Sequence, residues 1–143
     1  MTGAEGQAAF AGLTGRFQGQ GTWRDEAGDS HRYQVEMTLE ARDEGLHLSF
    51  THVFTEEPET EDVSFALVLR PEAPSILGFS IPGLPPGRGY YAEDLLHYTL
   101  PLPGNAVEVS CFFTASGCRV AGSSERNKAG RFIMWDERLS RLD

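Results

Sequence analysis

Apolar and polar side chains alternate along most of this chain, and the alternation is clearest between residues 30 and 40. The apolar set occupies odd positions (Tyr33, Val35, Met37, Leu39) and the polar set even positions (Arg32, Gln34, Glu36, Thr38, Glu40). Successive side chains of a β-strand point to opposite faces of its sheet, so this pattern predicts a strand with one buried and one hydrated face.

The same alternation recurs in further segments separated by short turns. One apolar face is shared by Leu46, Leu48, Phe50, His52 and Phe54. Residues 41–45 are short enough to join this strand to the preceding one as a hairpin. Further strands are predicted at 17–24, 63–70, 76–81, 107–113, 118–126 and 131–138. Residues 89–102 fit one bulged strand or two short ones, with a helical turn at 92–94 as a third alternative.

Eight to ten short strands with tight connections leave no room for helical crossovers, so the sheet is expected to be antiparallel. Such spacing is typical of a sandwich or an up-and-down barrel, and closure into a barrel removes both exposed edges. We therefore predict an all-β protein: a closed antiparallel up-and-down β-barrel with a short helix near its N-terminus. A length of 143 residues predicts one domain over 1–143.

Charge narrows the range of partners. The chain has 12 Lys and Arg against 21 Asp and Glu, a net charge of −9. This balance opposes binding to nucleic acid or to an anionic membrane surface. The sequence has no run of 18 apolar residues and no basic start followed by an apolar core, so we expect a cytoplasmic protein. The oligomeric state stays open, with a homodimer as one alternative.

Two charged segments are interpreted as hydrated surface. Residues 55–62 contain five acidic side chains, which could hold a hard cation but lack the ligand spacing of a calcium loop. Near the C-terminus, the arginines at 131, 138 and 141 lie beside Asp136, Glu137 and Asp143. Mixed charge of this kind is typical of a solvent-exposed face.

The two cysteines, Cys111 and Cys118, do not have zinc-site spacing. A disulfide between them is sterically possible if they flank a hairpin. Without an export signal, two reduced thiols in or near the core are the favoured interpretation.

Residues 13–23, with Gly15, Phe17, Gly19, Gly21 and Trp23, follow a short helical stretch and open the first predicted strand. This segment resembles the start of calycin barrels, the group that includes lipocalins, fatty-acid-binding proteins and nitrobindin-like proteins, and is most similar to the nitrobindin-like branch. The resemblance implies that a basic residue of the last strand packs over the Phe17 ring. Arg138 is the best match, with Arg131 second.

Nitrobindin-like proteins bind haem through a histidine late in the chain, and this sequence departs from them there. Its last histidine is His97, and none follows in the final predicted strands. The resemblance therefore transfers no haem ligand to this chain, and we expect no cofactor and no metal site.

His52 is the main polar candidate in the predicted interior, because it shares the apolar face of Phe50. A histidine there could orient a ligand, act as a base, or be a satisfied core residue. Further candidate ligand contacts lie on the apolar face of 30–40, in 89–102 and in the C-terminal aromatic group: Tyr33, Met37, Tyr90, His97, Tyr98 and Trp135.

These observations favour a binding protein over an enzyme: a barrel that takes up a small, largely apolar molecule in its interior. One alternative is an enzyme that uses His52 or His97 as acid or base. Another is a barrel packed by its own side chains that serves as an interaction or scaffold module. No nucleophile elbow or phosphate-binding glycine loop is present.

Overall fold

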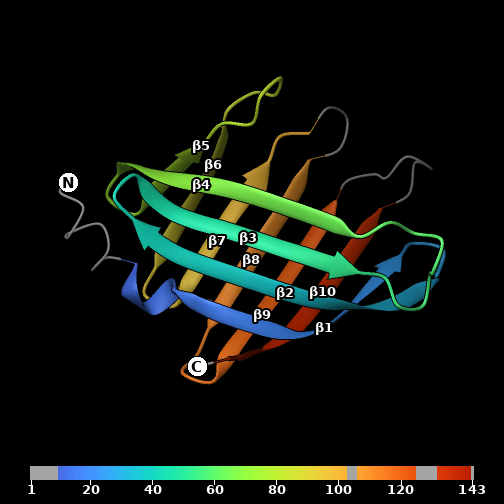
Figure 1. Ribbon diagram of the computed structural model, residues 1–143. Coiled ribbons are helices and arrows are strands. Elements are labelled where there is room, and N and C mark those ends of the chain that lie inside the picture. Colours follow the sequence, from blue (N-terminus) through green and yellow to red (C-terminus); the bar gives the residue numbers. More distant parts are fainter. Residues whose placement is uncertain (1–9, 103–105, 125–131, 143) are drawn as a thin grey trace.

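Ten antiparallel strands follow one another in chain order around a closed barrel (Figure 1). The computed structural model describes residues 10–102, 106–124 and 132–142. The strands are β1 (Gly15–Asp25), β2 (Ser30–Arg42), β3 (Gly45–Val53), β4 (Val63–Ala73), β5 (Ile76–Phe79), β6 (Gly87–Ala92), β7 (Leu95–Leu100), β8 (Val107–Phe113), β9 (Gly117–Ser124) and β10 (Ile133–Arg141). Each strand pairs with its neighbours in sequence, and β1 pairs with β10 to close the ring, which confirms the predicted up-and-down barrel.

Residues 89–102, for which the sequence allowed one bulged strand, two short strands or a helical turn, form parts of two strands. β6 and β7 pair as a hairpin whose turn is Glu93 and Asp94, and Glu93 has a left-handed φ of 49°. This turn fixes which side chains of the hairpin point inward: Leu96, Tyr98 and Leu100 are buried, and the residues between them are partly exposed.

A single 3₁₀ turn, η1 (Ala11–Leu13), precedes β1 and closes one end of the barrel. Phe10 and Leu13 have no exposed surface, and the Phe10 ring meets that of Tyr91 edge-on with centroids 5.1 Å apart. The predicted N-terminal helix is thus represented by this turn, and residues 1–9 lie outside the described part of the chain. The described residues include no helix long and apolar enough to cross a membrane.

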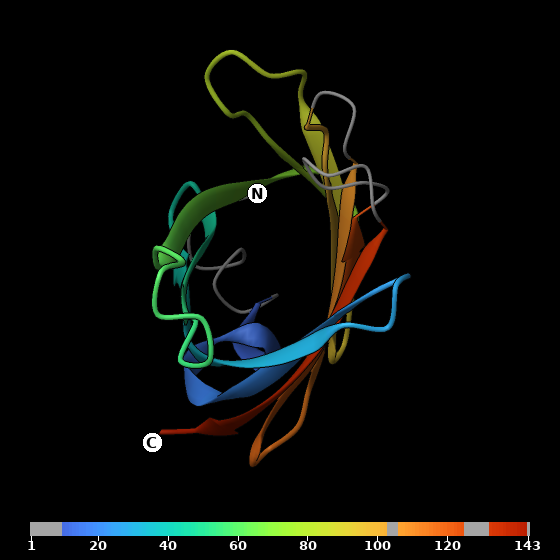
Figure 2. The same cartoon turned by 90° about the vertical axis from the view of Figure 1, so that its right-hand side faces the viewer.

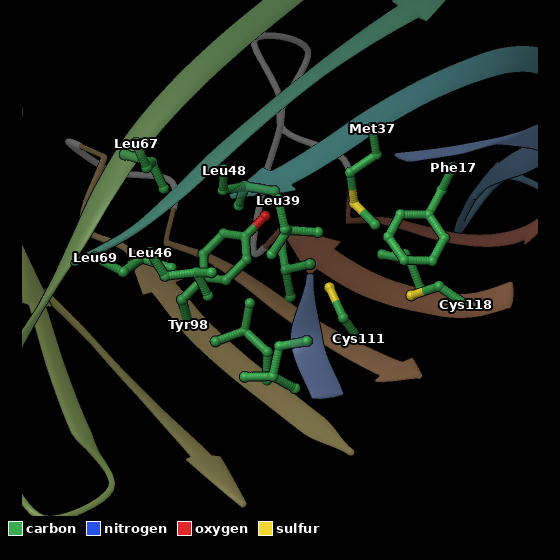
Figure 3. Close-up of a cluster of buried hydrophobic side chains, with 14 of the residues drawn as sticks. Phe17, Met37, Leu39, Leu46, Leu48, Leu67, Leu69, Tyr98, Cys111 and Cys118 are labelled. Carbon is green, nitrogen blue, oxygen red and sulfur yellow. The ribbon is translucent and has the colours of Figure 1, made fainter. Parts of the chain in front are cut away.

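The two sides of the wall, β1–β4 and β5–β10, face each other around the barrel interior (Figure 2). Apolar side chains fill much of this interior. Side chains from β2–β4 meet those from β7–β9 across this interior, as Leu39, Leu48 and Leu67 do with Tyr98 and Cys111 (Figure 3). Burial is complete toward the η1 end for Leu46, Leu69, Leu77 and Leu96, which have no exposed surface. Solvent does not reach these four side chains, whereas a pocket lies toward the other end of the barrel.

Candidate functional site

A pocket of about 440 Å³ opens at the end of the barrel opposite η1. Its walls come from four adjacent strands, β3, β2, β1 and β10, and from the loop that joins β3 to β4. It is lined by Trp23, Tyr33, His52, Phe54, Glu57, Thr60, Ile133 and Trp135. Four of these eight residues are Trp, Tyr or Phe, so the wall combines apolar ring surface with a few polar groups.

A smaller cavity of about 60 Å³ lies deeper in the barrel and shares His52 and Trp135 with the mouth pocket. Its wall includes Met37, Phe50 and Tyr98, together with the carboxylate-bearing Glu137. The mouth pocket and this inner cavity therefore meet at a histidine and an indole, with an acidic side chain just below them.

Glu137 is the only acidic residue of the described chain in the inner cavity wall, and it is 3% exposed. Its Oε2 accepts a hydrogen bond from the Tyr33 hydroxyl at 2.7 Å and lies 3.3 Å from His52 Nε2. Burial, followed by the negative charge and hydrogen bond of Glu137, raises the pKa of Tyr33 far above its usual range. Tyr33 therefore stays protonated and acts as a fixed donor to the carboxylate.

Gly21 makes the contact between Tyr33 and Glu137 possible. In the sheet register Gly21 of β1 lies between Tyr33 of β2 and Glu137 of β10. A Cβ at position 21 would lie 2.4 Å from Tyr33 Cζ and 2.6 Å from its hydroxyl oxygen. The missing side chain lets the phenol cross β1 and reach a residue two strands away.

Gly122 has a similar relation to Trp135. The two are register partners in β9 and β10, and a Cβ at 122 would lie 2.4 Å from Trp135 Cε2. The indole therefore lies flat across β9, where it forms part of both the pocket and the inner cavity.

Aromatic rings surround His52. Its ring centroid lies 4.8 Å from that of Tyr33 and 4.9 Å from that of Phe50, and the Phe54 ring stands edge-on to it. These contacts hold the imidazole in one orientation, with Nε2 toward Glu137.

The acidic loop between β3 and β4 forms part of the mouth. Glu57 Oε1 accepts a hydrogen bond from Trp23 Nε1 at 3.0 Å, and Glu56 accepts one from the backbone N–H of Arg32 at 2.7 Å. Residues 55–62 were interpreted from sequence as a hydrated turn. Most of the loop is exposed, but Glu57 and Thr60 line the pocket.

Six of the eight predicted ligand contacts point into the barrel and lie at these two spaces: Tyr33, Met37, Phe50, His52, Tyr98 and Trp135. Tyr90 and His97 do not join them. Their rings stack on each other on the outer surface with centroids 5.0 Å apart, and His97 Nδ1 lies 2.8 Å from the Ser110 hydroxyl. The turn at 93–94 places both residues on the outward positions of β6 and β7, so neither can contact a ligand inside.

The cation over Phe17 is Arg141, which corrects the prediction of Arg138. The Arg141 guanidinium carbon lies 4.7 Å from the Phe17 ring centroid, and its NH groups donate to the carbonyls of Thr14 and Thr114. Phe17 is the register partner of Arg141, whereas Arg138 is on an outward position of β10 and is exposed. The second candidate, Arg131, lies outside the described residues.

Sequence reasoning placed Glu137 on a hydrated surface, and the structure overturns this. The alternation of the sequence could have identified Glu137 as an inward residue. It shares one face of β10 with Ile133, Trp135 and Leu139, which are all apolar. Trp23 and Glu57 were also not identified as pocket residues.

Both cysteines are free, buried thiols on the inward faces of β8 and β9, as the sequence favoured. A hydrogen bond with Cys118, together with burial, raises the pKa of the Cys111 thiol. Within the described ranges, no group of three or more His, Cys, Asp or Glu residues is arranged to hold a metal ion.

No protein-family model and no curated protein matches this sequence. Several solved structures do share the fold. The S-type phycobiliprotein lyase CPES from Guillardia theta superposes with a TM-score of 0.72 at 13% identity, over 100% of this chain and 94% of that one. Rv2717c from M. tuberculosis superposes with a TM-score of 0.72 at 14% identity, over 96% of this chain and 98% of that one.

A protein of unknown function from the DUF3598 family of Nostoc punctiforme PCC 73102 gives a TM-score of 0.68 at 12% identity. The match covers 93% of this chain and 49% of that one. At such identities these likenesses establish the shared barrel architecture, and the site must be interpreted from this chain's own residues.

Proposed function

We propose that this protein is a calycin-type binding barrel that takes a small, largely apolar molecule into the mouth pocket. The pocket itself carries the proposal: about 440 Å³, walled by Trp23, Tyr33, Phe54 and Trp135, with His52 at its floor. Pockets for small molecules usually combine a volume of this order with apolar walls and a few polar groups that fix orientation.

Burial of apolar ligand surface supplies the affinity in this proposal. At about 25 cal/mol per Å², covering ~200 Å² of apolar ligand surface contributes about 5 kcal/mol before the entropy cost of association. His52 orients the polar end of the ligand, and Met37, Phe50 and Tyr98 accommodate any part that reaches the inner cavity. A fully packed scaffold barrel is less well supported, because the mouth pocket is far larger than a few water molecules.

The chain has two tryptophans, and both line the mouth pocket, which provides a direct assay. The neutral dye N-phenyl-1-naphthylamine should bind saturably at one site and quench tryptophan emission by energy transfer. His52→Ala should weaken binding by about tenfold, whereas the outer-surface variant His97→Ala should leave it unchanged. Absence of saturable binding, together with native mass spectra of protein from its own host that contain no retained small molecule, would overturn the proposal.

A second candidate function is acid–base chemistry in the same pocket, favoured by the contact between His52 and Glu137. A carboxylate 3.3 Å from one ring nitrogen can orient the imidazole and leave the other nitrogen for proton transfer. The phycobiliprotein lyase with the same fold is an enzyme by its name, so the architecture is compatible with catalysis. Conversion of a retained molecule by the wild-type protein but not by His52→Ala would favour this candidate.

A further inference from the structure

Apart from His52, whose Nε2 lies 3.3 Å from Glu137 Oε2, the ionisable groups with a charge at the pocket are acidic. The mouth is lined by the carboxylate of Glu57 and the inner cavity by that of Glu137. Among the described residues, neither lining contains Lys or Arg. A ligand with a carboxylate or phosphate would thus meet like charge in a partly desolvated site, which costs free energy.

Glu137 has unused capacity as an acceptor. Both of its side-chain contacts, from Tyr33 and to His52, are made by Oε2. Among the described residues no side chain or backbone N–H donates to Oε1, and since none of their buried polar side-chain atoms lacks a partner, Oε1 must reach the open space of the inner cavity that Glu137 lines. A buried carboxylate is stabilised when a cation or N–H donor reaches its second oxygen.

The aromatic walls also suit a positive charge. Of the four rings Trp23, Tyr33, Phe54 and Trp135 at the mouth, that of Trp135 also lines the inner cavity, and the negative face of such a ring attracts a cation. Glu57 holds the Trp23 indole by its N–H, which adds negative charge at the rim.

We propose that the ligand of this pocket is a hydrophobic amine, whose apolar body lies between the aromatic rings of the mouth and whose protonated nitrogen donates to Glu137 Oε1. This inference rests on the proposed function and adds the chemical class of the ligand. The nitrogen would lie where the mouth pocket and the inner cavity meet, between His52 and Trp135.

Three probes of equal chain length test the inference: octylamine, which is protonated at pH 7, 1-octanol and octanoate. Their dissociation constants are measured by tryptophan fluorescence at 0.15 M salt, where the general attraction of cations to a chain of net charge −9 is largely screened. We expect octylammonium to bind at least tenfold more tightly than octanol, and octanoate to bind most weakly.

Two isosteric variants test whether Glu137 causes the preference for octylammonium over octanol. Glu137→Gln should bring octylammonium to within about twofold of octanol and leave octanol binding unchanged. The control Glu36→Gln removes one negative charge from an exposed outer position of β2 and should leave the tenfold preference intact. Circular dichroism shows whether Glu137→Gln folds. If it does not, two measurements test the amine preference instead: the order of affinities of the wild-type protein for the three probes, and the preference for octylammonium over octanol in Glu57→Gln, which should be reduced.

The outcomes separate this inference from the proposed function. Octanol that binds as tightly as octylammonium would overturn the amine specificity and leave the binding function standing. A folded Glu137→Gln that keeps the full preference would overturn the role of Glu137. If none of the three probes binds, and the neutral dye does not bind either, the proposed function fails and the inference fails with it.

Discussion

The Tyr33 hydroxyl lies 2.7 Å from Glu137 Oε2, although the two residues are 104 positions apart in the chain and lie on strands that are not adjacent. The phenol passes over Gly21 of the intervening strand to make this bond. The contact therefore depends on the closure of the barrel, which brings β10 against β1, and on one residue without a side chain.

Gly21→Ala should destabilise the barrel by about 1–3 kcal/mol, because the new methyl group would overlap the Tyr33 ring and force it to move. Urea unfolding monitored by circular dichroism measures this cost. In a Tyr33→Leu background the same substitution should cost less, since the ring that causes the overlap is gone. The neighbouring Gln20→Ala, at an exposed position, is the control. An equal cost in both backgrounds would contradict the proposed overlap.

Tyr33→Phe should lower the free energy of unfolding by about 1.5–3 kcal/mol, the range for a hydrogen bond to a charged group. The ring remains, so packing against His52 and Phe54 is kept and the loss reports the hydroxyl alone. Tyr90→Phe removes a hydroxyl from the outer surface and should change stability by less than about 0.5 kcal/mol. Equal effects of the two substitutions in urea unfolding would show that the bond to Glu137 adds no stability.

Arg141→Met should destabilise the barrel by about 1–3 kcal/mol, because it removes the cation over Phe17 and leaves two backbone carbonyls without their donor. Arg138→Met removes the same charge from an outward position three residues earlier and is the matched control. Thermal unfolding of the two variants compares them directly. A larger effect at 138 would contradict the assignment of Arg141 as the stabilising cation over Phe17.

The sequence predicted the barrel because its strands have one buried and one hydrated face, as β2 does between Tyr33 and Leu39. The sequence did not identify Arg141 as the cation over Phe17, because the predicted last strand ended at 138. In the structure β10 continues to 141 and places that arginine opposite Phe17. A difference of three residues at a strand end was enough to select the wrong cation.

The functional site was partly accessible from sequence for the same reason. His52 lies on an apolar face and was identified, whereas Glu137 has charged neighbours at 136 and 138 that hide its inward position. The outward placement of Tyr90 and His97 depends on a turn whose position the sequence left open. Contacts between strands far apart in the chain, such as that of Tyr33 with Glu137, arise only on closure and have no local signal.

Two buried tyrosines should make the barrel sensitive to alkaline pH. Burial raises the pKa of Tyr33 and Tyr98 well above the usual tyrosine range, with Glu137 adding to the shift at Tyr33. In the unfolded chain both titrate near a pKa of about 10. Above that pH the folded state binds more protons than the unfolded state, so the free energy of unfolding must fall as pH rises.

Each tyrosine should contribute a loss of about 1.4 kcal/mol per pH unit once the unfolded phenol ionises, so the pair gives a slope of about 2.7 kcal/mol per unit above roughly pH 10.5. The slope from these groups declines below about pH 10 and vanishes well below about pH 9, where their contribution to stability is fully present. Urea unfolding at half-unit steps from pH 8 to 11.5 measures the profile. Tyr33→Phe should lower the alkaline slope by about 1.4 kcal/mol per unit and the Tyr33→Phe, Tyr98→Phe double variant by about 2.7 kcal/mol per unit, whereas Tyr90→Phe should leave it unchanged. The buried Cys111 thiol, whose pKa is also raised, keeps its own share of the slope in all three variants. A double variant that keeps the full wild-type slope would mean that these two buried phenols do not contribute to the pH dependence.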